Sequence, residues 1–214
     1  NGGEGKLYVE MLNRDQNKMQ VYEVNPKSGV SKLWYHEECE DGWIEYSNFD
    51  EWQWLNNGNV IVVSDRSGWR QVYLYAANGK KIRQLTQDGH DVTRCYGYDE
   101  KNKILYSQIA NTPMTRQNIR LQITGDKQQP TPMDDGKGWC ELNFNKDYTK
   151  YIEDYQTSAQ PNHYTMYQMK GGKWKTCKGV KEIEQVNKKN ETILNKWNAD
   201  CGLKKEFFSF VTER

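Results

Sequence analysis

The sequence predicts an all-β fold, a partial β-propeller made of four-stranded antiparallel blades. Three observations support it: a repeat of suitable length, the same order of strands in each repeat, and glycine-containing turns between strands. An aromatic residue ends the leading strand of each repeat just before a polar turn. Trp54, Tyr98 and Phe144 hold these positions, 44 and 46 residues apart. Spacings of this size are typical of propeller blades.

Each leading strand is followed by three further strands in the same order. The second strands read VIVVSD from Val60, ILYSQIA from Ile104 and YIEDYQ from Tyr151. The third strands read QVYLY, QNIRLQI and HYTMYQM, and the more polar fourth strands read KKIRQLT, KQQPTPM and KWKTCK. Asn78-Gly79 and Gly171-Gly172 are expected to form tight two-residue turns between third and fourth strands.

The first forty residues match the later part of the same repeat. KLYVEML, MQVYEV and VSKLWYHEE would be a second, third and fourth strand without a leading strand. The chain is therefore expected to contain about three complete blades preceded by most of another.

The C-terminal part loses the strand alternation. Apolar residues at loosely helical offsets predict a short helix within Val180–Asp200, with Asn190 or Thr192 as its cap. KKEFFSFVTER then returns to a strand pattern. We therefore expect two parts: propeller blades over residues 1–179, and a helical linker with an exit strand over residues 180–214.

Composition excludes several classes of function. The formal net charge is +1, from 30 basic and 29 acidic side chains, which gives no reason to expect a nucleic-acid partner. No stretch is apolar enough to span a bilayer. The five cysteines are widely spaced and lack metal-binding patterns, so most are expected to be buried thiols, and neither a metal nor a cofactor is expected.

Ser67 is the residue most easily mistaken for a nucleophile, because it lies beside Asp65, Arg66 and a Gly-Trp pair. A hydrolase nucleophile needs Gly-x-Ser-x-Gly on a strand-to-helix turn, whereas here another strand follows. We interpret Ser67 as a turn residue and expect no catalytic residue in the chain. The acidic stretch HEECEDGW from His36 is interpreted as a solvated loop between blades.

Other positions carry structural or binding expectations. Leading strands line the channel of a propeller, so the polar residues Ser47 and Asn48, in GWIEYSNFDEWQW, are candidates for substrate contact. Structural roles are expected for Gly68 and Trp69 at the tip between second and third strands, for Gly79 in its turn, and for Arg116, which would pin a loop through bidentate hydrogen bonds.

The blade WQWLNNGNVIVVSDRSGWRQVYLYAANGKKIRQLT resembles blades of the dipeptidyl peptidase IV family, especially its bacterial members. NTPMTRQNIRLQI, FNKDYTKYIEDYQTSAQPNHYTMYQM and CGLKKEFFSFVTER extend the resemblance, in order, over nearly the whole chain.

This resemblance implies a propeller fused to an α/β-hydrolase domain. The parent would be a periplasmic or secreted, homodimeric serine exopeptidase that removes X-Pro or X-Ala dipeptides from peptide N-termini. The segment itself would be an inactive scaffold, because the family's nucleophile motif is absent and its amine-binding glutamate pair is expected before residue 1. Ser47-Asn48 stands where some members carry Phe-Arg, so this chain departs from the family at that position.

Two other classes share parts of this pattern. A non-catalytic TolB-type propeller that binds proteins has similar blades, although a helical linker followed by KKEFFSF fits a domain junction better. A glycan-binding propeller is supported only by the eight tryptophans.

Overall fold

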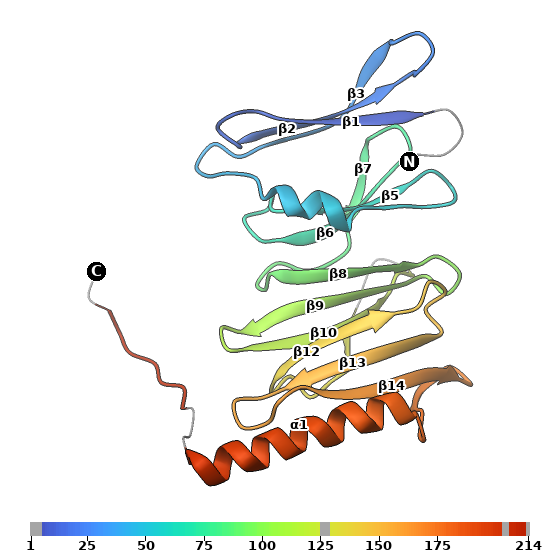
Figure 1. Cartoon of the computed structure of the whole chain (residues 1–214). Coiled ribbons are helices and arrows are strands. Elements are labelled where there is room, and N and C mark those ends of the chain that lie inside the picture. The colour runs from blue at the N-terminus through green and yellow to red at the C-terminus, as the bar shows by residue number, and fades with distance from the viewer. Residues whose placement is uncertain (1–5, 125–128, 203–205, 213–214) are drawn as a thin grey trace. The chain divides into compact units, whose positions relative to one another are not determined.

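Short antiparallel strands follow one another along most of the chain, and one long helix follows them (Figure 1). The structure is a computed structural model that describes residues 6–124, 129–202 and 206–212. The first strands are β1 (Leu7–Leu12), β2 (Lys18–Val24), β3 (Ser31–Glu38), β4 (Gln53–Trp54), β5 (Val60–Ser64), β6 (Gln71–Tyr75) and β7 (Lys81–Gln84). The remaining strands are β8 (Val92–Asp99), β9 (Ile104–Thr112), β10 (Thr115–Gln122), β11 (Thr131–Pro132), β12 (Trp139–Phe144), β13 (Lys150–Gln156), β14 (His163–Lys170) and β15 (Lys173–Thr176). A 3₁₀ helix, η1, spans Tyr46–Glu51, and α1 spans Lys181–Asp200.

The strands form sheets whose spatial order is their order along the chain. Within the described residues these are a three-stranded sheet, β1-β2-β3, and three four-stranded sheets, β4 to β7, β8 to β11 and β12 to β15. This is the arrangement of propeller blades, and the three-stranded sheet is the blade without its leading strand. The predicted fold class is confirmed.

The described residues divide into two compact units. The first contains the residues up to Ala110 together with Ile119–Thr131, and the second contains Asn111–Asn118 and the residues from Pro132 onward.

In the first unit, β5 is buried on both of its faces. Val60 and Val62 pack in one apolar cluster with Trp34 of β3, whereas Ile61 and Val63 belong to a second cluster that includes residues of β8 and β9. Burying each such side chain contributes about 1.5–3 kcal/mol relative to leaving it exposed. The continuous apolar run in VIVVS is thus explained by contact on both sides.

The two predicted tight turns differ. Gly171 and Gly172 both have positive φ angles, 58° and 74°, as expected for a two-residue turn between β14 and β15. In the other turn only Gly79 has a positive φ, 80°, so the expectation of two such residues was wrong for Asn78. The Gly79 N–H donates to the Ala76 carbonyl at 2.9 Å, which gives a longer turn ending in a left-handed glycine.

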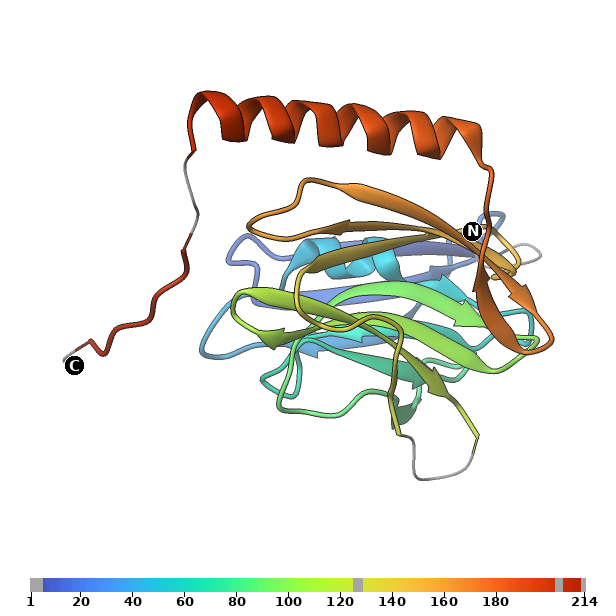
Figure 2. The same ribbon diagram turned by 90° about the horizontal axis from the view of Figure 1, so that it is seen from below.

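In the second unit, α1 runs along β14 (Figure 2). The Asn187 side chain accepts a hydrogen bond from the Tyr164 backbone N–H and donates one to the Tyr164 carbonyl, both at 2.8 Å. β15 pairs with β14 only from Tyr167 onward, so this side chain replaces a neighbouring strand at the open part of the edge. Asn190 likewise donates to the Asn162 carbonyl at 2.7 Å.

The helix prediction was correct in place but wrong in its caps. Val180 is the N-cap residue and makes no side-chain capping bond. Asn190 and Thr192 lie inside the helix, and Thr192 donates to the Lys188 carbonyl at 2.8 Å. Glu184 accepts from the Gly179 N–H at 3.1 Å, so an acidic residue in the first turn takes over part of the capping.

The described part of the tail, residues 206–212, contains no strand, although a strand was expected there. Phe207, Phe208 and Phe210 are exposed in it. A strand needs a neighbouring strand for its backbone hydrogen bonds, and alternation alone does not supply one.

Candidate functional site

The segment that contains Ser47 and Asn48 is a 3₁₀ helix rather than the expected leading strand. Ile44 is buried, and its N–H donates to the Gln16 carbonyl at 2.6 Å. Glu45 then caps η1 by accepting hydrogen bonds from the backbone N–H of Ser47 at 3.2 Å and from its hydroxyl at 2.8 Å. The polar side chain of Glu45 thus starts a helix where sequence reasoning expected alternation.

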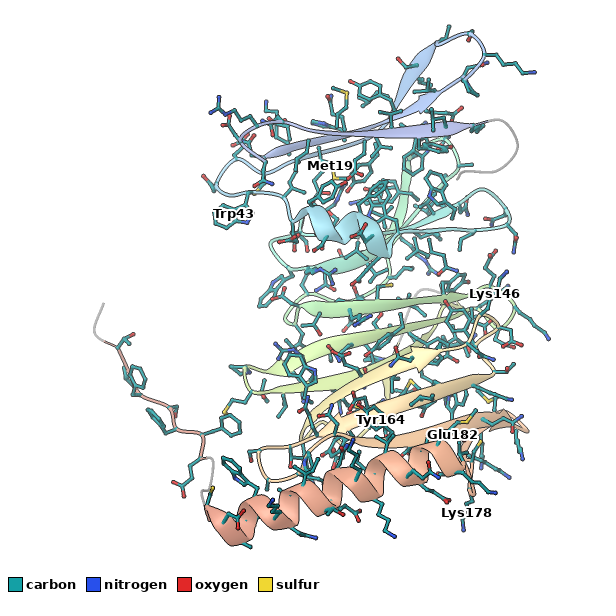
Figure 3. The ribbon with its side chains drawn as sticks, in the orientation of Figure 1. Met19, Trp43, Lys146, Tyr164, Lys178 and Glu182 are labelled. Carbon is teal, nitrogen blue, oxygen red and sulfur yellow. The ribbon has the colours of Figure 1, made fainter. Side chains whose placement is uncertain are left out.

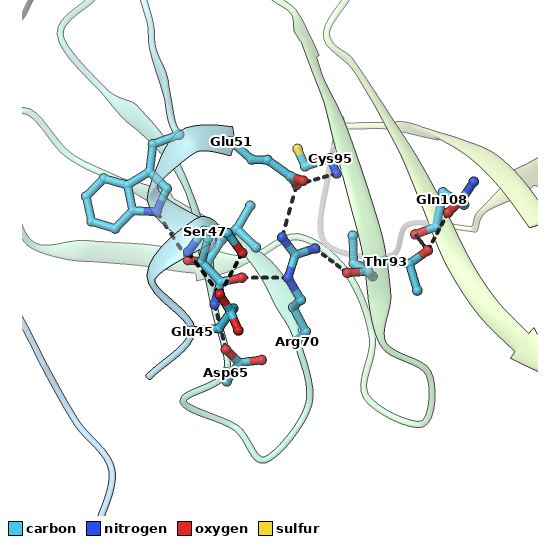
Figure 4. Close-up of polar contacts among 12 residues, drawn as sticks. Glu45, Ser47, Glu51, Asp65, Arg70, Thr93, Cys95 and Gln108 are labelled. Atoms are coloured by element: carbon cyan, nitrogen blue, oxygen red, sulfur yellow. Dashed lines mark hydrogen bonds and ion pairs between the residues drawn. The ribbon is translucent and has the colours of Figure 1, made fainter. Parts of the chain in front are cut away.

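The period of three residues in η1 separates its side chains into two sets. Asn48 and Glu51 lie one turn apart, and both contact Arg70 (Figure 4). Ser47 and Asp50, also one turn apart, are exposed. The two residues predicted as substrate contacts therefore have different surroundings.

Arg70 is the centre of this arrangement. Its Nε donates to Asn48 Oδ1 at 2.6 Å, its Nη2 lies 3.2 Å from Glu51 Oε2, and its Nη1 donates to the Val92 carbonyl. Glu51 Oε2 also accepts from the Cys95 N–H at 2.7 Å. Arg70 and Glu51 thereby tie η1 to β8 through charge-assisted hydrogen bonds.

Both polar atoms of the Asn48 side chain are engaged by protein groups. Its side-chain nitrogen donates to Asp65 Oδ2 at 2.5 Å, its oxygen accepts from Arg70, and the residue is only 4% exposed. Burial raises the pKa of Asp65, which the hydrogen bond from Asn48 and the charge of Arg70 partly offset. The geometry makes Asn48 a support for η1, and substrate contact by Ser47 stays a prediction.

The turn between β5 and β6 contains Asp65, Ser67, Gly68 and Trp69. Gly68 has a φ of 82°, and its N–H donates to the Asp65 carbonyl at 2.9 Å. Ser67 donates to Asp88 Oδ1 at 3.0 Å and contacts the Trp69 carbonyl at 3.3 Å. Trp69 precedes β6, which begins at Gln71, and its ring is exposed. These contacts are those of a turn.

Arg116 lies at the start of β10. Its Nη1 donates to the carbonyls of Thr115 at 2.9 Å and Thr112 at 3.3 Å. The guanidinium carbon lies 4.7 Å from the ring centre of Trp139. The residue holds the β9–β10 hairpin turn through two carbonyls and an aromatic face.

Sequence reasoning missed a buried polar group around Glu37. The predicted strand VSKLWYHEE is confirmed for His36 to Glu38, which lie in β3. The interpretation of the stretch from His36 as a solvated loop was wrong for Glu37, which is 5% exposed. Ser64 donates to Glu37 Oε1 at 2.6 Å, and Arg66 Nη2 lies 3.5 Å from Glu37 Oε2. The Arg66 guanidinium also lies over the rings of Tyr35, Tyr73 and Tyr75.

The signal for this group was in the sequence. Buried charges in proteins are paired, and an arginine two residues after a buried strand is close enough to pair with a neighbouring strand's carboxylate.

Burial raises the pKa of Tyr35 well above its ordinary value, so this phenol stays protonated as a hydrogen-bond donor to Glu37.

The cysteine expectation was correct only in part. Cys95 and Cys140 are buried, Cys39 and Cys177 are partly buried, and Cys201 is exposed, all as free thiols. Within residues 6–124, 129–202 and 206–212, no group of three or more histidine, cysteine or acidic side chains is placed to hold a metal ion. In the same ranges, no helix has the length and apolarity needed to span a membrane.

The second unit has a cleft of about 410 Å³ between the β13–β14 loop and α1. Gln160, Pro161 and His163 line one side, and Asn187, Glu191 and Leu194 line the other. Asn187 is already bonded to the Tyr164 backbone, so its amide holds the helix.

Comparison with known families decides among the propeller classes. Residues 2–162 match the model of the dipeptidyl peptidase IV (DPP IV) N-terminal region. The chain belongs to this family.

Individual members of the dipeptidyl peptidase IV family are similar over most of the chain. Dipeptidyl peptidase 4 of Trichophyton rubrum is 26% identical over 200 residues, which cover 91% of this chain and 24% of that protein. The crystal structure of Porphyromonas gingivalis dipeptidyl peptidase 4 aligns with a TM-score of 0.72 and 27% identity, over 86% of this chain and 26% of that one.

A more distant structure supports the fold alone. It is a putative dipeptidyl aminopeptidase IV from Bacteroides ovatus, with a TM-score of 0.58 and 20% identity over 80% of this chain. The chain thus spans about a quarter of the length of the curated relatives it matches.

Proposed function

We propose that this chain is a propeller segment of a dipeptidyl peptidase IV-like serine exopeptidase, with blades over residues 1–179 and a linker toward a hydrolase domain over residues 180–214. The observation that carries this proposal is the match of residues 2–162 to the family model. The order of the strands in the described sheets, which is that of propeller blades, agrees with it. The non-catalytic TolB-type alternative shares the blade pattern, but no observation favours it over the family match.

In this proposal the parent protein removes X-Pro or X-Ala dipeptides from peptide N-termini, and the segment is a non-catalytic scaffold that helps to enclose the substrate. The hydroxyl of Ser67 contacts Asp88 and the Trp69 carbonyl within a turn, which supports the proposal that this serine is not a nucleophile. A homodimeric, periplasmic or secreted parent belongs to the same proposal. Ser47, exposed on η1, is its candidate for substrate contact.

The test is the activity of the protein encoded by the complete open reading frame. We expect it to release a chromophore from X-Pro-linked substrates, and we expect the 214-residue chain alone to release none. Ser67→Ala should leave the parent's kcat/KM unchanged, whereas alanine at the serine of a downstream Gly-x-Ser-x-Gly motif should abolish turnover. An active parent that loses turnover through Ser67→Ala, or an inactive parent, contradicts the proposal.

A further inference from the structure

Lysines gather at one end of the sheet formed by β12 to β15. The β12–β13 turn lies between Phe144 and Lys150, and the β14–β15 turn is closed by the pair of Lys170 and Lys173. Because Lys150 pairs with Gln168, both turns lie at the same end of the sheet. Five exposed lysines, which we call the hairpin patch, belong to these turns and to β15: Lys146, Lys150, Lys170, Lys173 and Lys175.

The strand register places four of these lysines on one face of the sheet. Lys150 and Lys175 both pair with Gln168, and alternation along the strands adds Lys170 and Lys173 to the same face. Neighbouring strands lie about 4.8 Å apart, so these four positions are close to one Debye length, about 8 Å, from one another. Figure 3 shows the side chain of Lys146, in the β12–β13 turn, extending away from the strands. The patch therefore acts on its surroundings as one positive cluster.

Acidic side chains are scarce around the hairpin patch. Asp147 is the one acidic residue in the two turns, and its carboxylate accepts a hydrogen bond from the Thr149 hydroxyl at 2.7 Å. The sequence has no acidic residue between Asp154 and Glu182. None of the ion pairs within the described part of the chain includes a lysine of the patch. The near-neutral charge of the whole chain thus conceals a local excess of positive charge.

This arrangement opposes folding. Lys170 and Lys173 lie directly opposite each other on neighbouring strands, and like charges in such a pair destabilise a sheet. The Gly171-Gly172 turn needs small residues with positive φ angles but no lysine on either side of it. Because the fold gains nothing from the repulsive pair, we infer that its benefit comes from a partner of opposite charge.

The shape of the patch favours a broad anionic surface over a small ligand. The cleft of the second unit lies beside the β13–β14 loop, at the other end of the strands, so it does not enclose the patch. Lysine ammonium groups are point charges that bind anions without a fixed geometry. Leading strands line the channel of a propeller, so β15, a fourth strand, lies at the outer rim, where a large partner can reach it.

We propose that the hairpin patch binds the surface of membranes that contain anionic phospholipids. The ammonium groups contact the lipid phosphates, and the glycine turn provides no apolar side chain for insertion, so the attachment is peripheral and electrostatic. This inference goes beyond the proposed function and does not depend on peptidase activity.

The direct test is co-sedimentation of the 214-residue chain with phospholipid vesicles. Vesicles of phosphatidylcholine with phosphatidylglycerol are compared with vesicles of phosphatidylcholine alone. We expect the chain to bind the anionic vesicles at least about tenfold more tightly, with an affinity that falls as salt rises. Equal binding to both kinds of vesicle, or no binding to either, overturns the proposal.

A triple variant tests the lysines themselves. Lys170→Gln, Lys173→Gln and Lys175→Gln together should weaken binding to anionic vesicles at least about thirtyfold, since each lysine near an anionic leaflet contributes about fivefold. Arginine at the same three positions keeps the charge and should preserve binding. Circular dichroism and thermal unfolding verify that each variant is folded.

The matched control removes the same charge from α1. Lys181→Gln, Lys188→Gln and Lys189→Gln lie at exposed positions of that helix and should together weaken binding less than about threefold. An equal loss in this control would show that only net charge matters, and it overturns the proposal. Retention on heparin without binding to anionic vesicles also overturns it, because the partner would then be a polysaccharide.

The protein encoded by the complete open reading frame separates this proposal from the proposed function. Cleavage of X-Pro substrates without binding to anionic vesicles overturns the membrane surface and leaves the proposed function standing. Vesicle binding that the patch variant abolishes, in a protein without peptidase activity, overturns the proposed function and leaves the membrane surface standing.

Discussion

Gly68 and Gly79 have nearly the same backbone conformation but different surroundings. Their φ angles are 82° and 80°, a region that costs other residues about 1–2 kcal/mol. A Cβ at Gly68 would meet nothing within 4 Å, whereas a Cβ at Gly79 would lie 1.8 Å from the Trp34 carbonyl oxygen. Substitution of Gly68 therefore adds only the cost of a strained backbone, whereas substitution of Gly79 adds a steric clash as well.

Gly79→Ala should lower the free energy of unfolding by about 2 kcal/mol more than Gly68→Ala, because the turn must move away from the backbone of β3. Urea unfolding of both variants measures the difference. If both variants lost the same free energy of unfolding, the turn would be free to shift and the Trp34 carbonyl would not limit it.

Arg70 is expected to matter more for stability than an exposed arginine such as Arg14. Arg70→Met keeps the aliphatic stem but leaves Glu51 and Asn48 without their cationic partner, so unfolding should become easier by about 3 kcal/mol. Arg14→Met, at an exposed turn, is the control and should change stability by less than about 0.5 kcal/mol. Chemical denaturation measures both, and similar values would contradict the role given to Arg70.

At the scale of elements, β1 carries a carboxyl group whose charge opposes folding. Burial, together with the negative charge of Asp50, raises the pKa of Glu10 from 4.5 to about 7. Glu10 Oε1 is buried, and no hydrogen-bond partner for it lies among the described residues. The folded state thus favours the protonated acid.

Because the folded chain keeps this proton up to about pH 7 and the unfolded chain releases it near 4.5, stability should fall as the pH rises through that window. Glu10→Gln should stabilise the protein at pH 8.5 and change it little at pH 4. Urea unfolding at both pH values, with exposed Glu182→Gln as the control, measures the effect. A gain of the same size at both pH values would contradict the assignment.

In the docking of α1, the Asn187 side chain replaces a neighbouring strand for Tyr164. Asn187→Leu removes both hydrogen bonds to Tyr164, so hydrogen exchange of the Tyr164 amide should accelerate at least tenfold. Asn198→Leu, on an exposed position of the same helix, should leave that amide protected. Unchanged exchange in Asn187→Leu would show that other contacts hold the helix.

The strands could be predicted from the sequence because apolar and polar residues alternate along a strand whose two faces differ in burial. The 3₁₀ helix η1 was not, because it depends on Arg70, far along the chain, and on the capping by Glu45. Glu37 was misjudged for the same reason: its partners Ser64 and Arg66 come from another sheet. In the candidate site, the exposure of Ser47 and the burial of Asn48 follow from a helical period that the expected strand did not have.

At the scale of the whole molecule, the repeat of four strands and the family match agree. Blades of this kind bury both faces only where neighbours cover them, as β5 demonstrates within the first unit. The repeat was visible in the sequence because three aromatic residues mark it. The two compact units were not visible, because their division falls within β9 and β10 rather than between repeats.

The close approach of Gly79 to the Trp34 carbonyl also sets a distance within the first unit. Side chains in a core can be exchanged for smaller ones, but two backbones in contact cannot come closer. At this contact, the core residues between the sheet β1-β2-β3 and the sheet β4 to β7 can change during evolution while the spacing of the two sheets stays the same. Homologues that keep a glycine at this turn should keep the same sheet spacing even where their core residues differ.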